Sequence, residues 1–338
     1  MNLQSNISLK QCNTFGIDVY AKYLFAFSST DELQYLLSDK SFQNEEKLVL
    51  GGGSNILFTK NVEALVLKNE IGGIELIKET ENHFYVKAGA GVVWHELVLH
   101  CIQKGYAGIE NLALIPGNVG ASPMQNIGAY GVEIKDVFHS LEAIRISDNK
   151  KVILTKSECE FGYRESVFKH AYKNQFVITS VIYQLNKKPE FHISYGAIKE
   201  ELDRMEIQDL SIDAVAHAVM NIRRSKLPDP KVVGNAGSFF KNPEIDSSFF
   251  NELKNKFPQI VGYSNDLVFT KVAAGWLIEN CGWKGYRTGD AGCHDKQALV
   301  LVNFGNATGN EVFDLSEKII KSVKNKFGIE LQREVNIY

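Results

Sequence analysis

Three consecutive glycines directly after an apolar segment limit the folds open to this chain. The segment 47–50 predicts a β-strand, and the loop 51–56, which reads Gly-Gly-Gly-Ser-Asn-Ile, follows it. A Rossmann fingerprint needs a third glycine where Ile56 stands and then a helix, whereas residues 56–58 predict another strand. The loop therefore does not fit a Rossmann unit. It is either a tight hairpin turn or a nest of backbone N–H groups that binds an anion.

Two further glycine-rich loops lie at residues 115–131 and 234–243. The first contains four glycines and two prolines but no lysine in the Walker position, so it is not a nucleoside triphosphate P-loop. The second contains Ser238, but Phe240 breaks the G-x-S-x-G pattern of hydrolases. We expect Ser238 to donate a proton or a hydrogen bond rather than to act as a nucleophile. Two separate glycine loops in the first half suit a long dinucleotide better than a small metabolite.

Short predicted strands and helices interleave without regular βαβ units, so we predict the α+β class. A capping box beginning at Ser29 predicts one helix start. Other helices are expected at 93–104, 211–225, 247–256, 271–280 and 309–327. Strands are expected at 47–50, 64–67, 74–77, 84–87, 141–146, 151–155, 176–185, 298–304 and 329–337. Pro228 and Pro230 end the helix before them and mark the clearest domain boundary.

Composition excludes several functional classes. The 338 residues carry 40 acidic and 37 basic side chains, a net charge of −3, so no general nucleic-acid binder is expected. The five cysteines form no CxxC pair, which argues against a disulfide framework or a zinc ribbon. No apolar run reaches the roughly 18 residues of a membrane span, and the N-terminus resembles no signal peptide. We expect a cytoplasmic protein of about two domains.

Three polar features have both an ordinary and a functional interpretation. His95 and His100 lie five residues apart on a predicted helix, about 140° around its axis, so we expect no metal site there. Arg164 lies among aromatic and acidic residues, where it forms a structural ion pair or binds a substrate carboxylate. Glu334 shares the polar face of the last predicted strand, and its spacing alone does not mark it as catalytic.

Together these loops resemble the UDP-N-acetylenolpyruvoylglucosamine reductase family. The resemblance covers nearly the whole chain, in order. It is carried by residues 13–16 (Asn-Thr-Phe-Gly), 51–55, 115–131, 159–166, 226–230 (Lys-Leu-Pro-Asp-Pro), 234–243 and 331–335. Tyr195 matches a tyrosine found only in the longer form of the family, on a loop that closes over the substrate.

The resemblance implies a vanillyl-alcohol-oxidase-type (PCMH-type) FAD-binding module in two subdomains, followed by a C-terminal α/β substrate-binding domain. The implied ranges are 1–70 and 71–226 for the FAD-binding subdomains, 227–328 for the substrate domain and 329–338 for a strand returning to the active site. The residues implied to bind FAD are Gly51, Gly52, Gly53, Ser54, Asn55, Ile56, Ile115, Pro116, Gly117, Gly120, Ala121, Ser122, Gly128 and Arg223.

The implied reaction is the NADPH-dependent reduction of UDP-N-acetylglucosamine enolpyruvate to UDP-N-acetylmuramate, a step of peptidoglycan precursor synthesis. The hydride passes from NADPH through flavin N5 to the β-carbon in a ping-pong sequence. Ser238 matches the serine that protonates the α-carbon, and Arg164 and Glu334 match the pair at the substrate carboxylate. The implied substrate-binding residues are Tyr163, Tyr195, Lys226, Asn242 and Gln297. We expect a monomer without a metal or a nucleic-acid or membrane partner.

One position departs from the family, which often has proline directly before the terminal glutamate, where Arg333 stands here. Two alternative functions remain open at this point. One is a flavin oxidase of small alcohols on the same scaffold, which would need no clamp for a UDP-sugar. The other is a non-catalytic nucleotide-binding protein, which would be colourless. The visible spectrum of the purified protein separates this last alternative from the two flavoenzymes.

Overall fold

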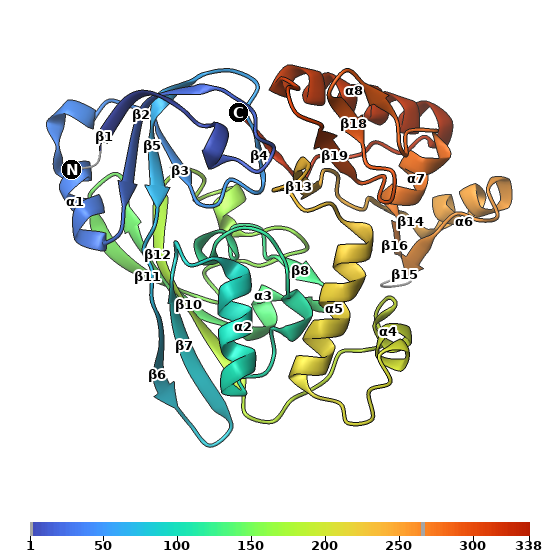
Figure 1. Cartoon of the computed structure of the whole chain (residues 1–338), viewed down its shortest axis with the longest axis horizontal. Coiled ribbons are helices and arrows are strands. Elements are labelled where there is room, and N and C mark those ends of the chain that lie inside the picture. Colours follow the sequence, from blue (N-terminus) through green and yellow to red (C-terminus); the bar gives the residue numbers. More distant parts are fainter. Residues whose placement is uncertain (1–2, 265–267) are drawn as a thin grey trace. The chain divides into compact units, whose positions relative to one another are not determined.

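The computed structural model describes residues 3–264 and 268–338, and the chain forms two compact units (Figure 1). Unit 1 comprises Met1–Ile7, Ala21–Gly52 and Val62–Ser225. Unit 2 comprises Ser8–Tyr20, Gly53–Asn61 and Lys226–Tyr338. Both units are therefore assembled from separated stretches of sequence. The finer boundaries expected at 70/71 and 328/329 remain predictions.

Unit 1 contains two main sheets. The smaller has the strand order β1-β2-β5-β3, with β2 and β3 parallel to β5. The larger has the order β11-β10-β12-β7-β6 and is antiparallel throughout. The strands are β1 Leu3–Ser8, β2 Tyr20–Phe27, β3 Lys47–Leu50, β5 Val62–Asn69, β6 Ile74–Glu79, β7 His83–Gly89, β10 Phe138–Arg145, β11 Lys150–Thr155 and β12 Phe176–Asn186, with β8 Gly128–Ala129 and β9 Val132–Glu133 as a short separate pair.

The helices of unit 1 begin and end where local signals place them. Ser29 caps α1 by accepting a hydrogen bond from the Glu32 N–H, and Gly105, at φ 74°, ends α2. Buried residues of α2 and α5, such as Leu97 and Val219, share one apolar core with Val181 of the larger sheet. The helices are α1 Thr30–Ser38, α2 Trp94–Lys104, α3 Ile134–Val137, α4 Ile198–Arg204 and α5 Ile212–Lys226.

Unit 2 contains an antiparallel sheet of order β13-β19-β18-β17, a three-stranded sheet of order β14-β16-β15, and a parallel pair of β4 and β20. A capping box of Thr308 and Glu311 starts α8, and Gly328, at φ 71°, ends it. The elements are β4 Ile56–Leu57, β13 Gly234–Ser238, β14 Glu244–Asp246, α6 Ser247–Lys256, β15 Gly262–Ser264, β16 Phe269–Val272, α7 Ala274–Asn280, β17 Arg287–Thr288, β18 Ala291–Cys293, β19 Val300–Asn303, α8 Gly309–Phe327 and β20 Asn336–Ile337.

The predicted α+β class is confirmed, with two corrections of detail. The helix expected at 271–280 begins only at Ala274, because β16 occupies residues 269–272. The strand expected at 329–337 is reduced to an isolated bridge at Arg333 and the two-residue β20. Its inside–outside alternation is right up to Val335, but its partner β4 is only two residues long.

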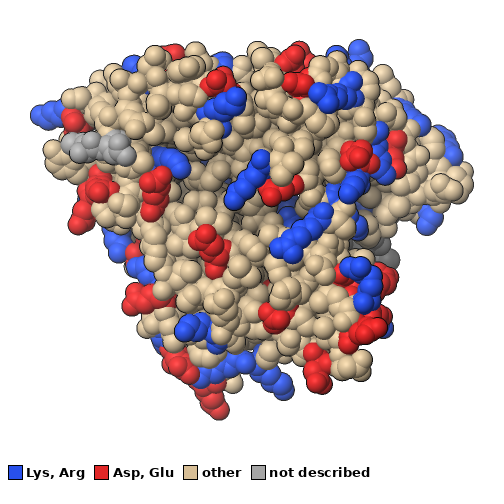
Figure 2. All heavy atoms as spheres, viewed as in Figure 1, with Lys and Arg blue, Asp and Glu red and all other residues tan. Residues whose placement is uncertain are grey.

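Surface charge follows the balanced composition. Figure 2 shows acidic and basic side chains interspersed on the face in view. Among the helices within residues 3–264 and 268–338, none is long and apolar enough to cross a membrane.

Candidate active site

The first two glycine loops meet within unit 1. A Cβ atom on Gly52 would lie 2.7 Å from Asn118 Oδ1 and 3.3 Å from the Gly117 Cα, whereas one on Gly51 would make ordinary contacts of 3.5 Å and more with Asn118. Asn118 cannot swing away freely, because its Nδ2 donates to the Gly91 carbonyl at 2.7 Å. Gly52 therefore permits the close approach of the two loops. Sequence reasoning did not single out Asn118, although it lies inside the second loop.

The second loop is anchored to the core of unit 1. The Gly120 N–H donates to the Ala90 carbonyl at 2.9 Å, and a Cβ on Gly120 would lie 2.7 Å from the Ala90 Cβ. The Ser122 hydroxyl lies 2.8 Å from the Tyr183 hydroxyl, and both residues are buried. Tyr183, on β12, was not predicted to matter. Its only signal in the sequence is that a tyrosine hydroxyl on an otherwise apolar strand needs a hydrogen-bond partner when it is buried.

Arg223, on α5, provides a direct test of whether unit 1 suits an anionic cofactor. Its Nε atom is buried and has no hydrogen-bond partner among the described residues. Burial also lowers the pKa of the guanidinium, with only Tyr130 acting against that shift. A buried donor without a partner is costly, so this environment favours a ligand that supplies an acceptor. A pyrophosphate or a flavin ring edge fits that requirement.

Arg164 lies in a tight turn closed by Gly162 and Glu165, whose backbones exchange two hydrogen bonds. Its φ of 54° is uncommon for a residue other than glycine and is often found at functional sites. The guanidinium donates to the Gly128 carbonyl at 2.5 Å, and a Cβ on Gly128 would lie 2.9 Å from Arg164 Nη1. Gly128, predicted as a cofactor residue, thus makes room for the arginine. The guanidinium carbon Cζ of Arg164 lies 5.5 Å from the centre of the Tyr163 ring.

The loop that carries Tyr195 packs on the end of the second glycine loop. Tyr195 is about half exposed, and a Cβ on Gly131 would lie 3.5 Å from the Tyr195 Cβ. Asn111, which is buried, joins the two loops by donating to the carbonyls of Tyr130 and His192. The structure therefore holds Tyr195 beside residues 128–131.

The first glycine loop continues into unit 2. Gly53 has φ 62°, and a Cβ there would collide with the Cys12 carbonyl oxygen, so only glycine fits. The Thr14 N–H donates to the Gly53 carbonyl at 3.0 Å, which ties this loop to the Asn13–Gly16 segment. Ser54 and Asn55 follow, and Ile56 begins β4, so the expected strand after the glycines is confirmed.

Unit 2 brings the end of β13, which carries Ser238, beside the extended segment that carries Glu334. Ser238 ends β13, where a bulge and Gly237, at φ 68°, change the direction of the strand. The Glu334 N–H donates to the carbonyl of Phe239, the residue after Ser238, at 2.8 Å. The Asn55 amide donates to the Glu334 carbonyl at 3.3 Å. The Glu334 backbone thus bonds to the neighbour of Ser238 and to the Asn55 side chain.

Asn242 and Gln297 lie at the start of α7. The Asn242 Oδ1 accepts a hydrogen bond from the Ala274 N–H at 2.9 Å. The Gln297 Oε1 would lie 3.0 Å from a Cβ on Gly275. Lys226, at the end of α5, is exposed. Amide and ammonium groups of this kind suit a phosphate or a sugar.

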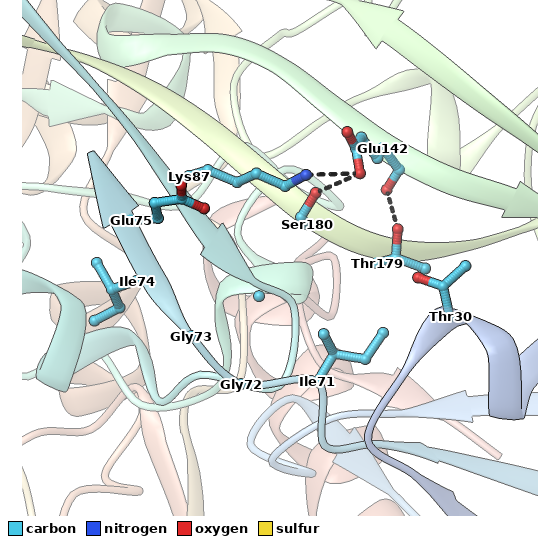
Figure 3. Close-up of a pocket in the computed structure, with 11 residues that line it drawn as sticks. Thr30, Ile71, Gly72, Gly73, Ile74, Glu75, Lys87, Glu142, Thr179 and Ser180 are labelled. Atoms are coloured by element: carbon cyan, nitrogen blue, oxygen red, sulfur yellow. Dashed lines mark hydrogen bonds and ion pairs between the residues drawn. The ribbon is translucent and has the colours of Figure 1, made fainter. Parts of the chain in front are cut away.

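A separate pocket of about 260 Å³ lies in unit 1, away from these residues (Figure 3). Lys87 and Ser180 converge there on the Glu142 carboxylate, at 3.0 and 3.2 Å. No residue of the predicted site lines this pocket in the part of the chain that the structure describes. The Glu142 carboxylate is thus already engaged by neighbouring side chains.

His95, of the His95–His100 pair, has a hydrogen-bond partner within the fold. His95 Nδ1 accepts a hydrogen bond from the Leu114 N–H at 3.1 Å, which gives this side chain a structural role. Residues 3–264 and 268–338 contain no cluster of three or more histidine, cysteine or acidic side chains able to hold a metal ion.

Comparison with known proteins identifies the family of the chain and its cofactor. A family model described as "FAD binding domain" matches residues 21–152, and one described as "UDP-N-acetylenolpyruvoylglucosamine reductase, C-terminal domain" matches residues 229–338. The reductase of that name from Flavobacterium johnsoniae is 50% identical over 338 residues, covering 100% of both chains. That from Amoebophilus asiaticus is also 50% identical, covering 100% of this chain and 99% of the relative.

A solved structure of the Thermus caldophilus reductase has a TM-score of 0.68 at 24% identity and covers 98% of this chain and 97% of that one. It shows a shared fold. The FAD-binding match spans both glycine loops of the first half, so the predicted cofactor, FAD, is confirmed. The unpaired Nε of Arg223 and the close approach of Gly52 to the second loop fit such a ligand.

Proposed function

The chain belongs to the UDP-N-acetylenolpyruvoylglucosamine reductase family, and on that premise we propose that it reduces UDP-N-acetylglucosamine enolpyruvate to UDP-N-acetylmuramate with NADPH. The observation that carries this assignment is the pairing of the Ser238 strand with the Glu334 segment in unit 2. Bound FAD supplies a flavin N5 that accepts a hydride from one substrate and gives it to the other.

Ser238 is the proton donor in this proposal. When a hydride reaches the β-carbon of the enolpyruvyl ether, negative charge develops at the α-carbon and spreads into the carboxylate. A serine hydroxyl is a weak acid, so it suits a strongly basic carbon. The bulge at Gly237 and the buried side chains of Phe239 and Phe240 restrain the backbone that carries this hydroxyl.

Arg164 and Glu334 act on the carboxylate of the same substrate. A guanidinium held in a rigid turn and braced by the Gly128 carbonyl is a preorganised donor for the developing charge. A glutamate helps at this position only when it is protonated or hydrogen-bonded. Its backbone is fixed from both sides, by the Phe239 carbonyl and by the Asn55 amide, which supports a role that depends on accurate placement.

The remaining predicted residues bind the UDP-sugar. Lys226 and Asn242 would contact the diphosphate, Gln297 the sugar nucleotide, and Tyr163 and Tyr195 the closed substrate. NADPH also carries a diphosphate, so we propose that the same groups bind each ligand in turn, which gives ping-pong kinetics. An initial-rate grid over both substrates tests this point. Parallel double-reciprocal lines are expected, and intersecting lines with a ternary complex would refute a single shared site.

The role of Ser238 is tested by comparing the two half-reactions in stopped flow. Ser238→Ala is expected to leave flavin reduction by NADPH within about twofold of wild type, because no proton is needed at the α-carbon in that step. Re-oxidation by the enolpyruvyl substrate should slow by about 10²-fold or more. Equal slowing of both half-reactions would contradict the assignment.

We also propose that the enzyme is a cytoplasmic monomer serving peptidoglycan synthesis. Size-exclusion chromatography would check the oligomeric state, and cell fractionation would check the location.

A further inference from the structure

Arg333, the residue directly before Glu334, is anchored on α8 by three side-chain contacts. Its Nε donates to the Ser316 hydroxyl at 2.8 Å, its guanidinium pairs with the Glu317 carboxylate, and its Cζ lies 4.5 Å from the Phe313 ring centre. Phe313, Ser316 and Glu317 are spaced as i, i+3 and i+4, so these three partners lie on one face of α8. Arg333 is only 20% exposed, and Ser316 is fully buried. This is a specific site rather than a loose surface pair.

The backbone beside Arg333 is restrained by a single β-bridge and by the Asn55 side-chain amide, which donates to the Glu334 carbonyl at 3.3 Å. Residues 332–334 form a single antiparallel bridge with the residues that follow β13, and Arg333 lies opposite Phe240. Its two hydrogen bonds run from the Glu334 N–H to the Phe239 carbonyl and from the Lys241 N–H to the Gln332 carbonyl, at 2.8 and 2.9 Å. These hydrogen bonds use only backbone atoms of residues 332–334. The anchor on α8 adds a restraint on the Arg333 side chain, and so on the side of the segment to which that side chain turns.

We propose that Arg333 is a positioning residue that aims the Glu334 carboxylate. Successive side chains of an extended segment point to opposite sides, so fixing residue 333 on α8 directs residue 334 away from that helix. The guanidinium of Arg333 is held on α8 through Nε and Nη2, and in this proposal it acts through the backbone. The inference rests on the proposed role of Glu334 in the second half-reaction.

Proline is the informative replacement at this position. The bridge uses the N–H groups of residues 334 and 241 but not that of residue 333, so proline removes no bridge hydrogen bond. Its ring fixes φ at about −65°, which restrains the backbone without any contact to α8. If Arg333 acts by restraining the backbone, Arg333→Pro should restore what Arg333→Ala loses. If the guanidinium itself matters, proline should fail.

The experiment measures both half-reactions of the FAD-loaded enzyme in stopped flow for Arg333→Ala, Arg333→Pro and Arg333→Lys. Arg333→Ala should slow reduction of the enolpyruvyl substrate about 10- to 100-fold, as expected for a misplaced group, and leave flavin reduction by NADPH unchanged. Arg333→Pro should return the rate to within about threefold of wild type. Arg333→Lys should remain slow, because an ammonium cannot reproduce the planar fork of the guanidinium.

Lys318→Ala is the matched control, since it removes an exposed cation from the same helix. It should leave both half-reactions unchanged. Glu317→Gln removes only one partner of the anchor. It provides a milder variant should Arg333→Ala fold poorly, with a smaller slowing expected in the same half-reaction.

Three results would overturn the inference: an Arg333→Ala enzyme with a normal second half-reaction, equal slowing of both half-reactions, or an Arg333→Pro enzyme as slow as Arg333→Ala. Glu334→Ala separates this failure from failure of the proposed function. If Glu334→Ala reduces substrate at the wild-type rate, the role of Glu334 is wrong. If Glu334→Ala is slow while Arg333→Ala is normal, only the role of Arg333 is wrong.

Discussion

The hydroxyl pair of Tyr183 and Ser122 links the second glycine loop to β12, the central strand of the larger sheet in unit 1, and its strength can be measured. The two oxygens lie 2.8 Å apart, and the residues are 0% and 1% exposed. Tyr183→Phe removes only one oxygen and keeps the ring, which packs edge-on against Trp94 at 5.7 Å. Ser122→Ala removes the other oxygen. Each single variant therefore leaves one buried hydroxyl without its partner.

The expected magnitude follows from that geometry. A buried polar group left without a hydrogen bond costs about 1–3 kcal/mol, so each single variant should lower the free energy of unfolding by that amount. The double variant leaves no unpaired hydroxyl. Its cost should therefore be smaller than the sum of the single costs by about 1–3 kcal/mol, a large coupling energy for neighbouring residues.

Urea unfolding of the four proteins measures this coupling. FAD must be held at one saturating concentration, because a cofactor that binds the folded state raises its apparent stability. Additive costs, with a coupling below about 0.5 kcal/mol, would show that the hydroxyl pair contributes nothing specific. Ser122→Ala should also weaken FAD binding more than Tyr183→Phe, since only Ser122 belongs to the loop assigned to the cofactor.

Three further predictions concern cofactor binding and pH. Gly52→Ala should weaken FAD binding at least about tenfold in a fluorescence titration, because its Cβ would force the two glycine loops apart, whereas Gly51→Ala should stay within about threefold. Arg223→Lys should likewise weaken FAD binding by removing the buried Nε donor, and the exposed neighbour's variant Arg224→Lys should match wild type in the same titration. Burial holds the pKa of His95 below its usual 6.5, so the folded protein resists its protonation and loses stability as the pH falls below 6.5; His95→Gln should flatten that part of the stability curve, and an unchanged slope would contradict the assignment.

Features encoded by neighbouring residues could be predicted from the sequence. Ser29 and Gly328 mark helix ends through hydrogen bonds and backbone angles that involve only adjacent residues, and the structure has both. The strand after the first glycine loop is also correct, because β-branched and apolar residues follow the glycines directly. These signals need no knowledge of distant partners.

Pairing between distant segments could not be predicted in this way. Nothing near Asn118 in the sequence indicates that it faces Gly52, and nothing near Phe239 indicates that it accepts a hydrogen bond from Glu334. The candidate catalytic residues came from family resemblance, since a serine or a glutamate alone carries no mark of its role. Arg333 appeared only as a departure from the family, and its anchor on α8 became visible only in the structure.

The discontinuous make-up of unit 2 has a consequence for how the chain folds during synthesis. Its first two segments, residues 8–20 and 53–61, pair with stretches that follow residue 225, as β4 does with β20. At 5–20 residues per second, a ribosome needs roughly 8–33 s to travel from residue 61 to residue 226. Throughout that interval these early segments lack their C-terminal partners. They carry the apolar side chains of Leu57 and Phe58, which end fully buried. Unit 1 can form its core before the chain leaves the ribosome, because its last residue is Ser225. Unit 2 cannot be completed until the last residues of the chain have been synthesised. Chaperone dependence and early aggregation should therefore concentrate in unit 2.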